Sequence, residues 1–221
     1  MNQAEYWNGA TGDKWAAAQE SMDHTLRPLG VAAMDALTLG AGHRVLDLGC
    51  GCGDTVLGLA ERVGPTGRVF GLDVSAPMLA LARLRVDRSP VAHRVELQLG
   101  DAAAAPLPKV DRLFSRFGAM FFEEPVPAFA HLRSALVTGG RVGFVCWRTS
   151  AENPWTSLTV AAVTAVLGPQ PPPDPHAPGP FAFADPERVR GILRDAGFEG
   201  VAIDPVDRDL QWTSTADEAT M

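Results

Sequence analysis

Three glycines alternate with small residues in the segment 45–54, which reads VLDLGCGCGD and joins a short apolar run to a helical pattern. Glycine has no β-carbon, so a backbone with glycine at Gly49, Gly51 and Gly53 turns tightly and approaches a ligand closely. The following helix presents free N–H groups to an anionic group of that ligand. A dinucleotide-binding loop has its third glycine at position 54, where this chain has Asp, so the spacing disfavours a nicotinamide cofactor.

Carboxylates stand at the ends of three expected strands around this loop. Asp47 lies just inside the first strand end, where it would repel a pyrophosphate and favours a cationic ligand. Asp73 ends the next strand, about 20 residues after the loop, where a carboxylate accepts both hydroxyls of a ribose. Asp101 ends the third strand, at a place suited to an exocyclic adenine amine. Because open parallel sheets bind ligands at the carboxyl ends of their strands, the three acids predict one nucleoside-binding edge.

Other reactive side chains give no catalytic group. Cys50 and Cys52 have no second Cys or His pair at ligand spacing, so no metal is expected. Histidines occur at 24, 43, 93, 131 and 176, but none is paired with a carboxylate that would orient it, so the catalytic residue stays unknown. Aromatic residues near the strand ends are candidates for a substrate pocket, and the aromatics of the polar N-terminal segment are candidates for a lid. The pocket candidates are Phe117, Phe121 and Trp147, and the lid candidates are Tyr6, Trp7 and Trp15.

An alternation of strand and helix patterns must position these residues. Short apolar runs predict strands at 44–48, 68–74, 95–99, 110–117 and 141–147, with a possible sixth at 199–205. Apolar residues at helical spacing predict helices at 26–39, 55–63, 75–88, 126–136, 155–167 and 185–196, and capping residues indicate another helix start at 213–218. Short connections between alternating elements predict a mostly parallel, doubly wound α/β sheet with helices on both faces.

Composition limits the class of protein. The length of 221 residues suits one domain, and a net charge of −7 with scattered arginines argues against a nucleic-acid partner. Three cysteines do not form a disulfide framework, which favours a reducing compartment. The N-terminus has no apolar signal-peptide core and no apolar run approaches the ~20 residues of a membrane span, so we expect a cytoplasmic protein.

The loop and the acids together resemble motif I and the following motifs of class I S-adenosylmethionine-dependent methyltransferases. The segments YWNGA (6–10), DVSAPM (73–78), RFG (116–118) and PGPFA (178–182) are similar to the ubiquinone/menaquinone C-methyltransferase-like branch. The resemblance implies a Rossmann-like methyltransferase fold, S-adenosylmethionine as cofactor, and methyl transfer to a small biosynthetic molecule by in-line displacement. The cofactor-binding residues it implies, together with those derived above, are Tyr6, Trp7, Asp47, Gly49, Gly51, Cys52, Gly53, Asp73, Val74, Met78, Asp101, Ala102 and Arg116.

The resemblance covers nearly the whole chain and divides it into four parts. We expect an N-terminal helical cap (1–40), a cofactor-binding core (41–150), a substrate-side insertion (151–184) and a C-terminal helix and strand (185–221). The last reversed strand of the family has no counterpart after residue 205, so we expect the fold to lack it and the chain to be truncated. Three alternative functions stay open: a non-catalytic S-adenosylmethionine-binding or assembly module, an RNA or protein methyltransferase, and a NAD-dependent oxidoreductase. The expected partner is a small-molecule acceptor, and a homodimer is left open.

Overall fold

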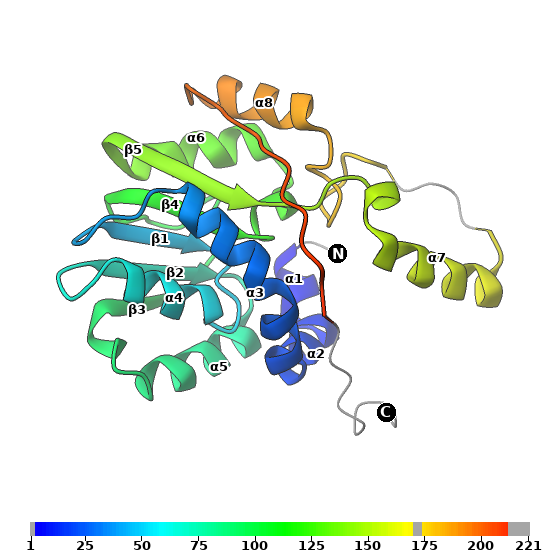
Figure 1. Ribbon diagram of the computed structural model, residues 1–221, viewed down its shortest axis with the longest axis horizontal. Helices are drawn as coiled ribbons and strands as arrows, with labels where there is room; N and C mark the ends of the chain where they lie inside the picture. Colours follow the sequence, from blue (N-terminus) through cyan, green and yellow to red (C-terminus); the bar gives the residue numbers. More distant parts are fainter. Residues whose placement is uncertain (1–2, 170–173, 212–221) are drawn as a thin grey trace.

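A five-stranded parallel sheet forms the centre of the computed structural model, which describes residues 3–169 and 174–211 (Figure 1). The strand order is β3-β2-β1-β4-β5, and every neighbouring pair is parallel. The strands are β1 (Arg44–Leu48), β2 (Arg68–Asp73), β3 (Val95–Leu99), β4 (Val110–Arg116) and β5 (Leu136–Val145). The expected doubly wound α/β fold is confirmed, and no antiparallel strand occurs in the described ranges.

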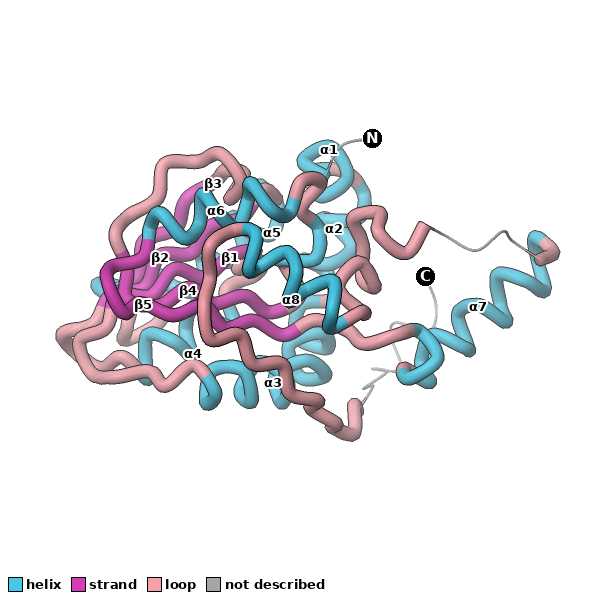
Figure 2. The backbone as a smooth tube through the Cα atoms, turned by 90° about the horizontal axis from the view of Figure 1, so that it is seen from above, coloured by secondary structure: helices cyan, strands magenta, loops and turns pink. Residues whose placement is uncertain are grey.

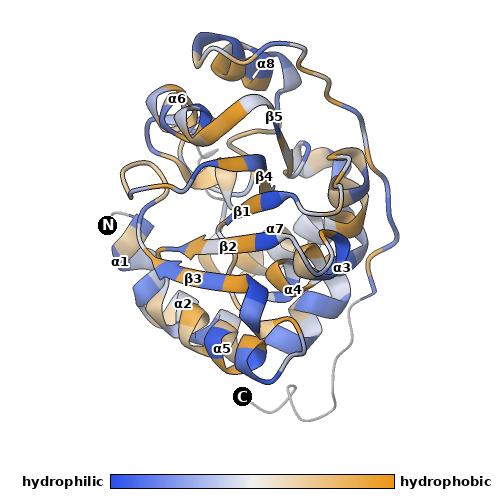
Figure 3. Ribbon diagram, turned by 90° about the vertical axis from the view of Figure 1, so that its left-hand side faces the viewer, coloured by the Kyte–Doolittle hydropathy of each residue, from blue (hydrophilic) through white to orange (hydrophobic). Residues whose placement is uncertain are grey.

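Helices cover both faces of this sheet (Figure 3). One face carries α3 (Gln19–Ala36), α4 (Asp54–Arg62) and α5 (Ala76–Asp87), and the other carries α6 (Pro125–Ala135) and α8 (Pro186–Asp195). Alternate residues of a strand point to opposite faces, so Val45 packs in the cluster with α4 while Leu46 packs in the cluster with α6. Burial on both faces explains why β1 reads as a continuous apolar run interrupted only by Asp47.

Local capping signals fix two helix starts. The Ser75 side chain accepts a hydrogen bond from the N–H of Met78 at the start of α5, and the Asp185 side chain accepts one from Glu187 at the start of α8. Each helix has proline in its first turn, where the missing N–H costs nothing. Both starts are confirmed as the sequence predicts them.

The remaining α-helices lie beyond the carboxyl ends of the strands (Figure 1). Two short helices, α1 (Gln3–Asn8) and α2 (Ala10–Ala17), precede α3 and lie near the ends of the strands (Figure 1). Helix α7 (Pro154–Leu167) follows β5 and projects away from the body, as Figure 2 shows from above. Single turns of 3-10 helix lie at η1 (Ala92–Arg94), η2 (Ala119–Phe121) and η3 (Ser150–Glu152). Among the described residues, every helix is too short or too polar to cross a membrane.

The predicted sixth strand is wrong. Residues 201–211 have no regular secondary structure and run as an extended strap past the sheet, where the Thr25 hydroxyl donates to the carbonyl of Gln211 at 2.8 Å. Val201 and Ile203 pack against the core, but no neighbouring strand edge pairs with their backbone in the described part of the chain. A strand needs such a partner as well as an alternating pattern. The helix start predicted at 213–218 lies outside the described residues.

Candidate cofactor site

The glycine-rich loop adopts a backbone that only glycine favours. Gly49, Gly51 and Gly53 have φ angles of 67°, 54° and 87°, in the left-handed region where a β-carbon is strained. A β-carbon on Gly51 would also lie 2.9 Å from Cε of Met78. The loop therefore uses its glycines for both conformation and close approach. Met78 is buried against the loop, and its predicted contact with the cofactor stays a prediction.

Asp73 ties the loop to the end of β2. One carboxylate oxygen accepts the N–H of Gly51 at 2.7 Å, and the other accepts the N–H of Ser75 at 2.8 Å. The residue is 8% exposed, and burial raises its pKa while these backbone hydrogen bonds oppose that rise. Each oxygen keeps a further lone pair, so the carboxylate can still accept a ligand hydroxyl.

Asp47 lies beneath the loop instead of facing solvent. It is 0% exposed, and one of its oxygens accepts the Thr55 hydroxyl of α4 at 2.5 Å. The other oxygen, Oδ1, is buried without a hydrogen-bond partner among the described residues. Removal from water raises the pKa of Asp47 from 3.8 to about 7, although Thr55 and the nearby Arg116 lower it. The site thus contains a carboxylate that a nearby cation would stabilise in its ionised form.

The end of β3 presents a different environment. Asp101 is exposed and one of its oxygens accepts the N–H of Ala103 at 2.8 Å, which holds the following turn. Its neighbour Ala102 is buried. The Asp101 side chain is therefore accessible at the end of β3, and its predicted contact with adenine stays a prediction.

The N-terminal helices dock on the loop that follows β2. Asn8 donates to the carbonyl of Val74 at 2.7 Å and accepts the N–H of Ala76 at 2.9 Å. The Ser75 hydroxyl donates to the carbonyl of Trp7 at 2.8 Å. Tyr6 lies on the same short helix and packs edge-on against Trp7, with ring centroids 5.3 Å apart. The segment expected to act as a lid therefore lies beside Asp73.

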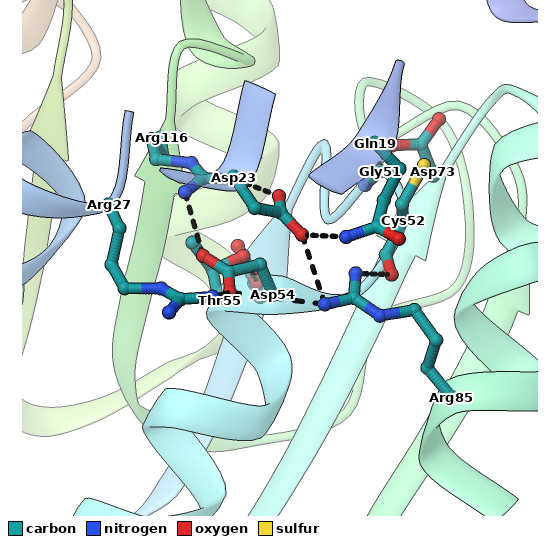
Figure 4. A network of polar contacts seen from close by, with 11 residues as sticks. Gln19, Asp23, Arg27, Gly51, Cys52, Asp54, Thr55, Asp73, Arg85 and Arg116 are labelled. Carbon is teal, nitrogen blue, oxygen red and sulfur yellow. Dashed lines mark hydrogen bonds and ion pairs between the residues drawn. The ribbon is translucent and has the colours of Figure 1, made fainter. Parts of the chain in front are cut away.

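Arg116 joins the N-terminal cap to the start of α4 (Figure 4). Its guanidinium contacts Asp54 at 2.9 Å and Asp23 of α3 at 3.3 Å. Asp54 is the first residue of α4, where a carboxylate also interacts favourably with the helix dipole. Arg116 is thus a structural link between elements, and its predicted contact with a cofactor stays a prediction.

Arg85 of α5 extends the same network to the glycine loop. It contacts Asp23 at 3.0 Å and donates to the carbonyl oxygen of Cys52 at 2.5 Å. Cys52 itself is buried, which raises the pKa of its thiol to about 12. The network is completed by Gln19, which donates to Asp23, and by Arg27, which pairs with Asp54.

A cavity of about 1280 Å³ lies beside β5, between α3, the strap and the root of α7. Phe117 and Trp147 line it and stack with ring centroids 4.3 Å apart. Phe117 has φ +59°, a strained backbone conformation of the kind found at ligand sites. Phe121, the third predicted pocket residue, packs on Trp7 at 5.3 Å and does not line this cavity.

Known proteins are similar to this chain in sequence. A family model described as "Methyltransferase domain" matches residues 45–140. The chain is 34% identical over 178 residues to the 2-phytyl-1,4-naphtoquinone methyltransferase of Thermosynechococcus vestitus, covering 76% of this chain and 78% of that protein. It is 30% identical over 210 residues to the nocamycin O-methyltransferase of Saccharothrix syringae, covering 87% of this chain and 71% of that protein. The chain belongs to the class I S-adenosylmethionine-dependent methyltransferases.

A solved structure and two further curated relatives show how much of each similar protein this chain covers. The solved structure of the [4+2]-cyclase SpnF is similar with a TM-score of 0.58 and 25% identity, covering 78% of this chain and 57% of that chain. Other curated relatives are matched over only 35% and 51% of their length, so the chain spans a third to a half of those proteins. The methyltransferase fold and the family are established by these matches, and the family's cofactor is S-adenosylmethionine.

The residues present fit that cofactor. The family's cofactor carries a cationic sulfonium, and Asp47 Oδ1 is a buried carboxylate oxygen without a hydrogen-bond partner in the described ranges. Gly51 leaves free the space that a β-carbon would fill, and Asp73 keeps acceptor capacity next to it. The described residues contain no group of three or more His, Cys, Asp or Glu side chains placed to hold a metal ion.

Sequence reasoning missed Asn8, Asp23 and Arg85. Asn8 lies inside the YWNGA segment that carries the family resemblance, so that segment was the available signal. Asp23 and Arg85 have no local signal, because their partners come from α3, α5, β4 and the loop, which are far apart in the sequence. Only the packing of these elements brings the charges together.

Proposed function

We propose that this chain transfers the methyl group of S-adenosylmethionine to a small-molecule acceptor. The observation that carries the proposal is the glycine loop held by Asp73, whose carboxylate accepts the Gly51 N–H. The bound cofactor supplies the reactive methyl group. Asp73 would accept the ribose hydroxyls and Asp101 the adenine amine. Met78 would pack on the purine, and the glycine loop would enclose the methionine end. The protein's main contribution is then orientation and exclusion of water.

The acceptor is proposed to enter at the aromatic end of the cavity. Phe117 and Trp147 follow the carboxyl ends of β4 and β5 and stack on each other, which offers an apolar, flat wall. Two relatives are named for a naphthoquinone and for nocamycin, so a cyclic biosynthetic intermediate is a reasonable acceptor class. The net charge of −7 disfavours RNA as the acceptor.

Calorimetric titration of the full chain with S-adenosylhomocysteine, the demethylated product, tests the cofactor assignment. We expect binding, and we expect Asp73→Ala to weaken it by about 1–3 kcal/mol, the cost of leaving ribose hydroxyls unpaired. Asp195→Asn removes an exposed charge on α8 and serves as the control that leaves affinity unchanged. A folded chain that binds neither S-adenosylmethionine nor its product would refute the proposal.

A second candidate is a protein that binds the same cofactor without transferring its methyl group. The similarity to a protein described as a [4+2]-cyclase supports this second candidate. Incubation with methyl-labelled S-adenosylmethionine and a panel of cyclic acceptors separates the two functions. Label in an acceptor supports transfer, whereas binding without label in any acceptor supports the second candidate.

A further inference from the structure

Helix α7 carries the largest set of exposed apolar side chains in the described part of the chain. Residues 159–167 are all exposed, and the helix sequence PWTSLTVAAVTAVL contains no charged residue. Val160, Val163 and Val166 are 57%, 40% and 81% exposed. A helix without charged residues on any face is normally covered by other protein on its apolar sides. Single exposed apolar residues are ordinary, but seven apolar residues within the exposed stretch 159–167, with only Thr159 and Thr164 among them, mark an interaction surface.

The root of α7 holds the helix in its projecting orientation. Glu152 accepts both the hydroxyl and the N–H of Thr149, which closes a capping box before the helix. Asn153 donates to the carbonyl of Thr149 at 2.9 Å, and the Thr156 hydroxyl donates to the carbonyl of Asn153 at 2.8 Å. Because these bonds fix the first turn, α7 points away from the cavity beside which it begins (Figures 1 and 2).

We propose that α7 is the surface through which two copies of this chain pair, each α7 lying antiparallel to the other and across the mouth of the partner's cavity. Twofold symmetry supports this arrangement. Since α7 starts at the mouth of its own cavity and points outward, an antiparallel second α7 brings its free end back to that mouth. Trp155 of the root lines the cavity, so the paired helix would roof the aromatic end of the cavity. That last consequence rests on the proposed function, whereas the pairing does not.

Charge favours a second copy over a membrane surface. Each chain has a net charge of −7, so two copies repel unless they meet where charge is lacking, and α7 is such a place. Helices that lie in a membrane interface carry Lys or Arg on a polar face, and α7 has neither. At 14 residues it is also shorter than the ~20 residues that span a bilayer.

The area available is sufficient for a specific dimer. The exposed part of α7 is a cylinder roughly 10–12 Å wide and about 14 Å long, with a side surface near ~450 Å². Complete enclosure of both helices buries about 900 Å² of helix surface. The rims of the two cavities that cover the outer halves of the helices add roughly 400 Å², so the pair buries up to roughly 1,300 Å², within the range of stable interfaces.

The mass of the full chain in solution, measured by light scattering across a concentration range, tests the pairing. We expect twice the mass of one chain for the native protein and a single-chain mass for Val163→Glu, with an unchanged circular dichroism spectrum. Leu84→Glu is the matched control, because Leu84 is 54% exposed on α5, away from α7, and should leave the dimer intact. A native chain of single-chain mass at every concentration overturns the proposal, as does a Val163→Glu dimer.

A cross-link gives an independent readout should the glutamate variant not fold. Val163 is the middle residue of the exposed stretch, so the twofold axis of an antiparallel pair passes beside it. Val163→Cys is expected to form an intermolecular disulfide on mild oxidation, whereas Leu84→Cys is not. Equal cross-linking of the two variants overturns the proposal. Co-sedimentation of a single-chain native protein with vesicles of phosphatidylcholine and phosphatidylglycerol would also overturn it, in favour of a lipid contact.

Discussion

Replacement of Asp47 by asparagine should stabilise the protein, and more so as the pH rises. The folded chain buries this carboxyl completely, with Oδ1 unbonded among the described residues and Oδ2 bound to the Thr55 hydroxyl. Desolvation raises its pKa to about 7, against 3.8 in the unfolded chain. Asparagine has nearly the same shape, keeps a carbonyl oxygen for Thr55 and has no charge to bury.

The magnitude follows from proton linkage. Between the two pKa values the folded state binds more protons than the unfolded state, so stability falls as the pH rises through that window. One pKa unit corresponds to about 1.4 kcal/mol, so the rise from 3.8 to about 7 costs the wild type up to about 4 kcal/mol above pH 7. The advantage of Asp47→Asn is therefore expected to be about 1 kcal/mol near pH 4.5 and about 2–4 kcal/mol near pH 8.5.

Urea unfolding followed by tryptophan fluorescence at these two pH values measures the effect. Titration of Asp73 and other carboxyls occurs in both proteins and cancels in the difference. Asp195→Asn, which removes an exposed carboxylate, should give a small difference that does not change with pH. If Asp47→Asn destabilises the protein equally at both pH values, Asp47 is ionised and well paired in the folded state, and the reasoning is refuted.

Two further substitutions test the loop and the ionic network. Gly51→Ala should lower the unfolding free energy by about 1–2 kcal/mol from left-handed strain, plus the cost of its contact with Met78. Gly64→Ala is the matched control, because Gly64 has a similar φ angle and a β-carbon added there would have no atom within 4 Å. Equal losses of unfolding free energy in the two variants would show that the contact with Met78 contributes nothing. Asp23→Ala removes one of two carboxylates shared by Arg85 and Arg116, which keep Asp54, and should cost about 2 kcal/mol, against less than about 1 kcal/mol for Asp35→Ala in an exposed pair. Equal small losses in urea titrations of both aspartate variants would exclude a structural role for the network.

Much of the fold follows from local patterns in the sequence. The strands β1 and β3 have the predicted bounds, and β2 and β4 end one residue before the predicted position. A short apolar run that lies between a glycine-rich turn and a helical pattern predicts a buried strand, whichever strands lie beside it in the sheet. The helices α5 and α8 start where Ser75 and Asp185 predict, since a cap acts within three residues. The glycine loop is predictable for the same reason, because alternating glycines permit a left-handed backbone that other residues resist.

Tertiary structure decides the features that depend on a distant partner. The segment 199–205 has a strand-like pattern but does not pair with the outer edge of β5, because the cavity lies between the two segments. Strand β5 begins at Leu136 instead of residue 141 because pairing with β4 extends it backward. Asp47 has a pKa near 7 because the surrounding core excludes water from it, a property that its place in the sequence does not carry. In the same way, Asp23 meets Arg85 and Arg116 only after α3 packs across the ends of α5 and β4.

Sequence by itself determined the backbone elements and the family, because those are local and repeated signals. The electrostatic environment of the site, and the exposure of α7, come from burial and packing, which are properties of the assembled fold alone.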